Sequence, residues 1–378
     1  MDPHSAFPPT RAAALARLAR FAPRAGPAYA AGRNDDPAPG ETGAVSRLSP
    51  YLRYRLLGED EVVAGVLRHH AWPECRKFVD EVLWRTYWKG WLEQRPAVWT
   101  RYLAACREAR EGLADAALLA AAEAGRTGIA GFDHWARDLV ATGYLHNHAR
   151  MWFASIWIFT LRLPWALGAD FFLRHLLDAD PASNTLSWRW VAGLHTAGKT
   201  YLATAENIAR HTGGRFAPQG LAREAVPLTE PGSAPEPILP LPPGDPWPAD
   251  GPVLLLVTPE DLHPEALVPP GSSVAAALVI HDDALLWGER ARGFVAAAAA
   301  DAAARIGAHL GCPVEIGPRL AAAPLIAAAE AAGVRRIVTP HASVGPVATA
   351  LATMEADLAA AGITLMRPRR AWDERLWP

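Results

Sequence analysis

Two short segments hold residues that could bind a polar ligand. Residues 178–190 read "DADPASNTLSWRW" and pack two Asp, one Asn and two Trp into one stretch. This density is hard to explain as ordinary core, because a buried carboxylate needs a charged or hydrogen-bonding partner. Residues 143–151 read "GYLHNHARM" and precede the apolar run "WFASIWIFTLRLPW". Polar residues at such an edge either cap a helix or contact a ligand.

Residues 46–52, "SRLSPYL", have the composition of a phosphate-binding helix start. Ser49 before Pro50 predicts a helix N-cap followed by proline at the first helical position. The free N–H groups of that turn, together with Ser46 and Arg47, would suit a phosphate group. Taken alone, the segment indicates a plain capped helix.

Tryptophan is unusually frequent, with fifteen Trp against seven Tyr and ten Phe. These residues cluster between Trp72 and Trp190, and so many large rings need a packing or electronic use. Within this region, "DEVLWR" (80–85) puts Glu81 and Trp84 on one face of a helix. That pair fits either ligand contact or simple surface packing.

Several other chemistries are excluded. Residues 193–200, "GLHTAGKT", match a phosphate-binding loop formally, but no aliphatic strand precedes them, so nucleotide hydrolysis is not predicted. The three cysteines are far apart and form no CxxC pair, which argues against disulfides, zinc or an iron–sulfur cluster and favours the cytoplasm. The histidines of "LHNH" lie two positions apart and do not share a helix face. We predict no metal.

The secondary structure that the sequence predicts around these residues changes along the chain, from helices to a linker and then to alternating strands and helices. Apolar residues at three- and four-residue spacing predict an all-helical domain over residues 1–217. A Pro-rich linker is expected over 218–252. Short aliphatic runs such as "VLLLV", "VAAALVI", "PVEIG" and "RRIVTP" then alternate with Ala-rich helices over 253–378, which predicts a small α/β (Rossmann-like) domain with a parallel sheet buried on both faces.

Bulk composition sets further limits. The chain has 378 residues, 51% of them hydrophobic, and a net charge of −2, so nucleic acid could bind only at a local basic patch. No apolar run reaches the length of a membrane span. The N-terminal "RAAALARLARFAPRAG" fits an amphipathic helix with Leu15, Leu18 and Phe21 on one face better than an Arg-rich transit peptide.

Taken in order, these segments resemble the flavin-binding domain of the photolyase–cryptochrome family, and cyclobutane-dimer photolyases in particular. The resemblance covers about residues 11–217. The segments that carry it are "YAAGRNDDPAPGETGAVSRLSPYL", "VDEVLWRTYW", "GRTGIAGFDHWARDL", "GYLHNHARMWFAS" and "DADPASNTLSWRW". Spacings agree with the family pattern without gaps from Asn147 through Trp190.

The resemblance implies a non-covalent FAD inside the helical domain. It implies that Asn184 faces the flavin N5, that Asp178 and Asp180 accept hydrogen bonds from the cofactor, and that Arg150 pairs with Asp178. Ser46, Arg47 and Ser49 would hold the pyrophosphate. The full set of cofactor-binding residues implied in this way is Tyr29, Ser46, Arg47, Leu48, Ser49, Arg85, Arg150, Asp178, Asp180 and Asn184.

The resemblance also implies light-dependent DNA repair, in which reduced FAD passes an electron to a pyrimidine dimer flipped out of the duplex. The residues implied around the dimer are Glu81, Trp84, Asn147, His148, Met151 and Trp190. Trp188 and Trp165 match the inner two residues of the family's electron relay. The third relay position has no aromatic counterpart, which leaves Trp99, Trp152 or Trp157 as substitutes.

Two departures leave alternatives open. His148 stands where the dimer photolyases carry Arg, and the α/β domain, which precedes the helical domain in the family, follows it here. The α/β part resembles the family's antenna domain only loosely, so a second, antenna chromophore stays unidentified. The main prediction is a repair enzyme that binds damaged DNA. A cryptochrome-like blue-light receptor with a signalling partner is the alternative, and a helical scaffold that has lost its flavin is the third.

Overall fold

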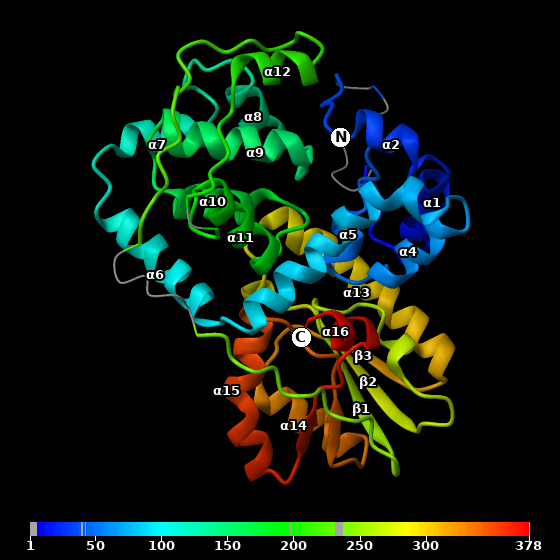
Figure 1. The fold of residues 1–378 in the computed structure, drawn as a ribbon. Helices are drawn as coiled ribbons and strands as arrows, with labels where there is room; N and C mark the ends of the chain where they lie inside the picture. Colours follow the sequence, from blue (N-terminus) through cyan, green and yellow to red (C-terminus); the bar gives the residue numbers. More distant parts are fainter. Residues whose placement is uncertain (1–5, 39–40, 42, 197, 231–236, 378) are drawn as a thin grey trace.

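Helices make up the first two hundred residues and a parallel sheet lies in the last third. The computed structural model describes residues 6–38, 41, 43–196, 198–230 and 237–377 (Figure 1). The helices before the first strand are α1 (Arg11–Phe21), α2 (Pro27–Gly32), α3 (Ser49–Arg53), α4 (Glu59–Leu67), α5 (Trp72–Glu93), α6 (Ala97–Glu111), α7 (Ala116–Glu123), α8 (Phe132–Thr142), α9 (Asn147–Ser155), α10 (Trp165–His175), α11 (Pro181–Val191) and α12 (Ala205–His211). The sheet part contains β1 (Val253–Val257), β2 (Val274–Ile280), α13 (Glu289–Leu310), β3 (Val314–Gly317), α14 (Ala322–Ala331), β4 (Arg336–Val338), α15 (Pro346–Ala360), β5 (Thr364–Met366) and α16 (Ala371–Leu376). The predicted fold class, all-helical followed by parallel α/β, is confirmed.

Local signals in the sequence explain where several helices begin and end. Thr10 and Asp115 accept hydrogen bonds from the first turns of α1 and α7, as N-caps do. Gly143 ends α8 in the left-handed conformation, with φ 72°. The predicted apolar face of α1 was wrong in one position, because Leu15 is exposed whereas Leu18 and Phe21 are buried. The helix turns by 100° per residue, and this places Ala14 toward the core instead.

The five strands form one parallel sheet in the order β3-β2-β1-β4-β5. Alternate residues of the central strands face opposite sides. Leu255 and Val257 pack with α13, whereas Leu254 and Leu256 pack with α14 and α15. The expectation that every strand is buried on both faces was wrong for β3, an edge strand in which Ile316 is 50% exposed.

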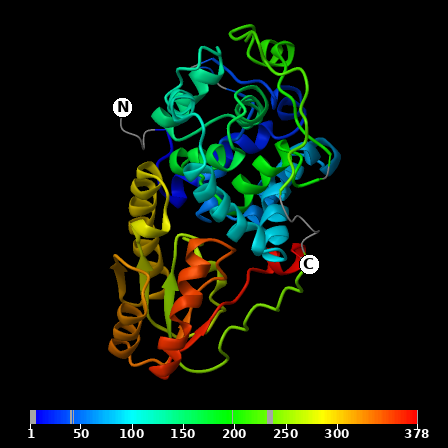
Figure 2. The same ribbon diagram turned by 90° about the vertical axis from the view of Figure 1, so that its left-hand side faces the viewer.

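The helical and sheet parts share an apolar core. One cluster of buried side chains combines residues of α1 to α5 with β1, β2 and α13. The ring of Phe294 on α13 lies 6.1 Å from Tyr51 and 5.5 Å from Tyr54 (centroid distances). Figures 1 and 2 both show α13 passing from the sheet toward the helical part. The two parts therefore bury each other's apolar surface.

The Pro-rich segment between the two parts contains no helix or strand in its described residues, as expected. It contacts both parts: the Leu228 N–H donates to the Ala192 carbonyl (2.9 Å), and the Gly244 N–H donates to Glu374 (3.0 Å). Figure 2 shows it running along the outside of the molecule. The predicted domain boundaries at 217 and 253 remain predictions. Over the described ranges, no helix is both long and apolar enough to cross a membrane.

Gly168 on α10 packs directly against the rings of Trp157 and Trp188. A Cβ at this helical position would lie 2.5 Å from Trp188 Cζ3 and 2.9 Å from Trp157 Nε1, so only glycine lets these rings approach α10. We expect Gly168→Ala to lower the free energy of unfolding by about 1–3 kcal/mol through overpacking. Gly307→Ala is the matched control. A Cβ there meets Val314 at an ordinary 3.4 Å, and alanine should stabilise α13 by up to about 1 kcal/mol.

Urea unfolding of both variants, followed by circular dichroism, measures these changes. Equal stability of Gly168→Ala and the unsubstituted chain would contradict the packing described for Trp157 and Trp188.

Candidate functional site

A cavity of about 600 Å³ opens among α3, α5, α9 and α11 in the helical part. It lies in the size range of small-molecule and cofactor sites. Every predicted site residue lines it except Asp180 and Trp165. The predicted residues that line it are Tyr29, Ser46, Arg47, Leu48, Ser49, Glu81, Trp84, Arg85, Asn147, His148, Arg150, Met151, Asp178, Asn184, Trp188 and Trp190.

The segment before α3 forms one end of the cavity. Arg47 adopts the left-handed backbone conformation (φ 53°), which costs a non-glycine residue about 1–3 kcal/mol and is typical of functional sites. Its guanidinium lies over the rings of Tyr144 (4.6 Å) and Phe7 (4.9 Å). The predicted cap at Ser49 was wrong. The cap position is Leu48, without a side-chain hydrogen bond, so Ser49 is the first residue of the helix and its hydroxyl is not used as a cap.

Arginines gather where this cavity meets a second one. A neighbouring cavity of about 560 Å³ shares Ser46, Arg47 and Tyr144 with it. Among the described lining residues of that second cavity are five arginines and three carboxylates, namely Arg17, Arg20, Arg24, Arg47, Arg215, Asp36, Glu41 and Asp138. The excess of arginine makes this end suited to phosphate.

Helix α11 forms another part of the cavity wall. Asp180 caps it by accepting a hydrogen bond from the Ser183 N–H (2.7 Å), and Pro181 follows at the first helical position. This start places Asn184 at the cavity one turn later. The Asn184 side-chain amide donates to the Ala169 carbonyl (2.9 Å), and the side chain lines the cavity. Among the described residues, its Oδ1 accepts no hydrogen bond.

The two aspartates differ in their surroundings. Asp178 lines the cavity and receives both hydrogen bonds of the predicted ion pair from Arg150 Nη2 (3.1 and 3.2 Å), which confirms that pair. Asp180 lies behind the wall, where Arg85 Nη1 donates to its Oδ2 (3.0 Å). Burial favours the neutral acid, but Lys89, Arg85 and Arg53 overcome it and hold the pKa of Asp180 well below its ordinary value. Asp180 is thus an ionised cap that stabilises the start of α11.

The mouth of the cavity carries Glu81 and Trp84 on α5. Glu81 forms an ion pair with Arg33, while burial raises the pKa of its carboxyl against the opposing effect of that arginine. Trp84 is 49% exposed and stacks on Trp88, with ring centroids 5.4 Å apart. Trp190 on α11 stacks on Tyr201. The flat rings of Trp84 and Trp190 therefore line the cavity from two different helices.

The segment "GYLHNHARM" both caps a helix and lines the cavity. His146 accepts a hydrogen bond from the His148 N–H (3.2 Å) and so caps α9, and burial lowers its pKa to about 4. Asn147 and Met151 face the cavity. His148 also lines it, but its ring nitrogens contact the Asn34 carbonyl (3.0 Å) and the Tyr201 hydroxyl (3.1 Å). Burial lowers the pKa of His148, so this side chain supplies no full positive charge at neutral pH.

Trp165 lies away from the cavity, in a separate row of aromatic rings. Its ring centroid is 5.7 Å from that of Tyr102, which is 5.2 Å from Trp99, which in turn is 5.7 Å from Trp287. Trp287 belongs to the sheet part and is partly exposed. The row therefore runs from the interior of the helical part to the surface.

Sequence reasoning missed several lining residues. Arg33, Trp88, Tyr144 and Phe172 all line the cavity. Tyr144 stands inside the quoted "GYLHNHARM", and Arg33 inside "YAAGRNDDP", so their places next to assigned residues were the available signal. Nothing in the spacing of Phe172 distinguishes it from core.

The lining has the chemistry that a dinucleotide flavin requires. Ser46, Ser49 and Arg47 offer hydroxyl and guanidinium donors for a pyrophosphate. Asn184 Oδ1 offers an acceptor for a ring N–H, and Trp188 and Phe172 offer apolar walls for a flat ring system. The residues present therefore fit FAD. Across the described residues, no cluster of three or more His, Cys, Asp or Glu side chains suits a metal ion.

Comparison with known proteins gives one consistent match. Residues 78–221 match the family described as the FAD binding domain of DNA photolyase. A deoxyribodipyrimidine photo-lyase of Thermus thermophilus is 36% identical over 220 residues, which cover 58% of this chain and 51% of that protein. The corresponding protein of Streptomyces griseus is 37% identical over 154 residues, or 40% and 33% of the two chains. This chain thus spans about half the length of the first relative and a third of the second.

Among solved structures, a class III photolyase from Agrobacterium tumefaciens is 27% identical and has a TM-score of 0.47 over 55% of this chain and 44% of that chain. The family match includes α11 and its aspartates, and neither it nor the two relatives extend over the whole chain. Through residues 78–221 of this helical region, the chain is therefore similar to the FAD binding domain of DNA photolyase.

Proposed function

We propose that the protein is a light-dependent DNA repair flavoprotein of the deoxyribodipyrimidine photolyase kind, with FAD bound non-covalently in the cavity of the helical part. The observation that carries the proposal is the lining of that cavity. Residues chosen from separate sequence segments face one space, and its lining includes both groups suited to phosphate and aromatic rings suited to base stacking. The relatives named as deoxyribodipyrimidine photo-lyases support the same reaction.

Bound FAD would supply the light-driven electron transfer that splits a pyrimidine dimer, and the chain supplies position and electrostatics. Asn184 Oδ1 would orient the flavin ring, and Arg150 would hold the Asp178 side chain in place beside it through its hydrogen bonds. Ser46, Arg47 and Ser49 would hold the pyrophosphate. These roles follow from the donors and acceptors that face the cavity.

Damaged DNA is the proposed partner. A dimer is hidden within the duplex and must be flipped out to reach a buried cofactor. Trp84 and Trp190 would stack on its two bases, at about 1–3 kcal/mol for each stacked base. Glu81, held by Arg33, would accept hydrogen bonds from the base edges, and Asn147 and Met151 would contact the dimer from α9.

His148 gives the alternative function its support. Both of its ring nitrogens have partners within the chain, and its lowered pKa keeps it neutral, so it adds little attraction for a phosphate. A cryptochrome-like blue-light receptor would need no such attraction, but would need a signalling partner. The exposed Trp84 at the mouth favours repair over this alternative, because a receptor has no use for a base-stacking surface there.

Removal of the Trp84 ring tests the repair proposal. We expect Trp84→Ala to weaken dark binding of an oligonucleotide with one thymine dimer by roughly 5- to 100-fold, since one base stack is lost. Trp72→Ala is the matched control, because Trp72 lies on the same helix with a similar exposure of 47% and does not line the cavity. Fluorescence anisotropy measures both affinities. Equal affinity of Trp84→Ala and the unsubstituted chain for the damaged oligonucleotide would overturn the assignment.

The aromatic row provides a second test. We propose that Tyr102 and Trp99 continue the electron relay beyond Trp165, in place of its missing third residue, and that Trp287 ends it at the surface. Trp165→Phe should slow light-driven reduction of bound FAD at least about tenfold in the presence of a thiol donor, because phenylalanine is much harder to oxidise.

Trp99→Phe should slow reduction less, since it removes only the outer step, and Trp91→Phe, outside the row, should leave the rate unchanged. Absorbance under steady blue light gives each rate. Reduction of the Trp165→Phe variant at the original rate would exclude this route.

A further inference from the structure

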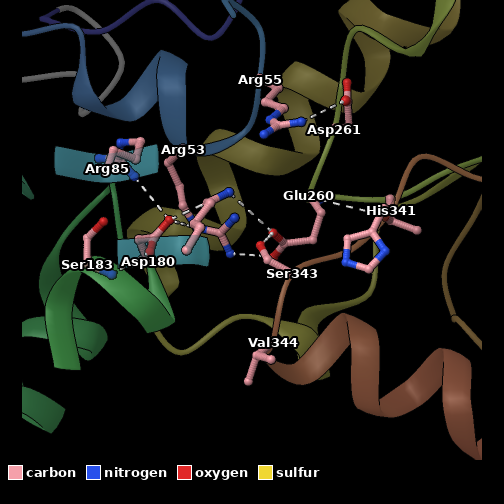
Figure 3. Close-up of polar contacts among 12 residues, drawn as sticks. Arg53, Arg55, Arg85, Asp180, Ser183, Glu260, Asp261, His341, Ser343 and Val344 are labelled. Atoms are coloured by element: carbon pink, nitrogen blue, oxygen red, sulfur yellow. Dashed lines mark hydrogen bonds and ion pairs between the residues drawn. The ribbon is translucent and has the colours of Figure 1, made fainter. Parts of the chain in front are cut away.

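The sheet order places a ligand-type crevice at the centre of the α/β part. Strands β2 and β3 follow β1 on one side, and β4 and β5 lie on its other side. In such doubly wound sheets, ligands bind at the carboxyl ends of the two strands where the order reverses, here β1 and β4. Glu260 follows β1, and His341, Ser343 and Val344 follow β4. Figure 3 shows these four residues close together.

The helical part fills this crevice with its own side chains. Arg53, at the end of α3, donates from Nη2 to Glu260 Oε1 (2.7 Å), and the Ser343 hydroxyl contacts Glu260 Oε2 (3.4 Å). Glu93, the last residue of α5, accepts from the Val344 N–H (2.6 Å) and contacts His341 Nε2 (3.0 Å). Glu93 thus takes the place that an anionic ligand would occupy ahead of α15.

Arg53 and a second buried cation, Lys89 on α5, also reach Asp180 at the start of α11. Arg53 Nε and Lys89 Nζ each lie 3.9 Å from Asp180 Oδ2, and Lys89 Nζ is also 3.9 Å from Glu260 Oε2. Asp180 caps α11, which carries Asn184. Figure 3 shows Arg53 between Asp180 and Glu260. The four charged side chains are only 1–4% exposed, so water cannot replace a missing partner.

We propose that Glu260 is a positioning residue for the flavin cavity. It neutralises Arg53 and Lys89 from the sheet side, and this fixes both cations against Asp180 and holds the start of α11 in place. The α/β part then supports the helical part. Because side chains of the helical part fill the β1–β4 crevice, any second chromophore binds elsewhere. The effect of Glu260 on FAD affinity rests on the proposed FAD binding. Its effect on the position of α11 does not.

Loss of the Glu260 charge tests the proposal on the full chain. In Glu260→Gln, Arg53 and Lys89 keep one carboxylate instead of two, and both shift toward Asp180. We expect hydrogen exchange, read by mass spectrometry on the FAD-free chain, to be at least about tenfold faster in residues 181–191. We also expect the FAD dissociation constant to rise at least about tenfold, with an altered visible circular dichroism spectrum of the bound flavin.

Glu265→Gln is the matched control. Glu265 is also buried and paired with an arginine, Arg305, but that pair lies within the α/β part and has no contact with Asp180. It should lower stability without changing exchange in α11 or FAD affinity. Glu260→Asp keeps the charge on a side chain one methylene shorter, so both changes should be smaller than in Glu260→Gln but still measurable; it also serves if Glu260→Gln does not fold.

The outcomes separate the two proposals. Unchanged α11 exchange in a folded Glu260 variant, or a change of the same size in Glu265→Gln, overturns the positioning role. Faster α11 exchange in a chain that binds no FAD even when unsubstituted supports the positioning role and overturns the proposed function.

Discussion

Buried charge pairing is the constraint on which the rest of this structure depends. Arg53 and Lys89 lie between two carboxylates, Asp180 in the helical part and Glu260 in the sheet part. Charges removed from water cost several kcal/mol each unless their partners are complete, and removal of one partner typically costs about 3–5 kcal/mol. Burial would lower the pKa of Arg53, but Glu260 and Asp180 raise it. The pairing therefore demands one relative position of the two parts.

The shared apolar core also fixes the position of the helical part relative to the sheet part. The rings of Tyr51 and Tyr54, on and just after α3, pack on Phe294 of α13. Helix α16 adds a further contact between the two parts, since Trp372 Nε1 donates to the Thr86 hydroxyl (2.9 Å) on α5. Since α5 also carries Glu81 and Trp84, the sheet part supports the mouth of the cavity as well as its wall. A cavity built from short helices such as α3 gains its rigidity from this support.

Much of this arrangement could be predicted from the sequence, for reasons that differ between its parts. Helical periodicity and the aliphatic runs depend on local side-chain patterns, so the fold class was predicted. The cavity residues were predicted because their spacing from Asn147 through Trp190 follows a family pattern; the spacing alone gives no indication of a cavity. The cap at Ser49 was predicted one position away from Leu48, because Pro is tolerated at either of the first two helical positions.

What the sequence could not predict depends on contacts between distant segments. Nothing near Glu260 marks it as a partner of Arg53, 207 positions earlier. Asp180 was expected to contact the cofactor, whereas the structure surrounds it with Arg85, Arg53 and Lys89 behind the cavity wall. Likewise, the row from Trp165 to Trp287 joins the two parts of the chain, so no local pattern contains it.

The most direct test of the central claim uses one purified sample. The visible spectrum is recorded, the bound flavin is reduced, and an oligonucleotide with a single thymine dimer is illuminated with blue light alongside a dark control. The account predicts one FAD for each chain and restoration of the dimer to two thymines only in the light. A sample that binds no FAD, or that binds it and leaves the dimer intact in the light, would contradict the account.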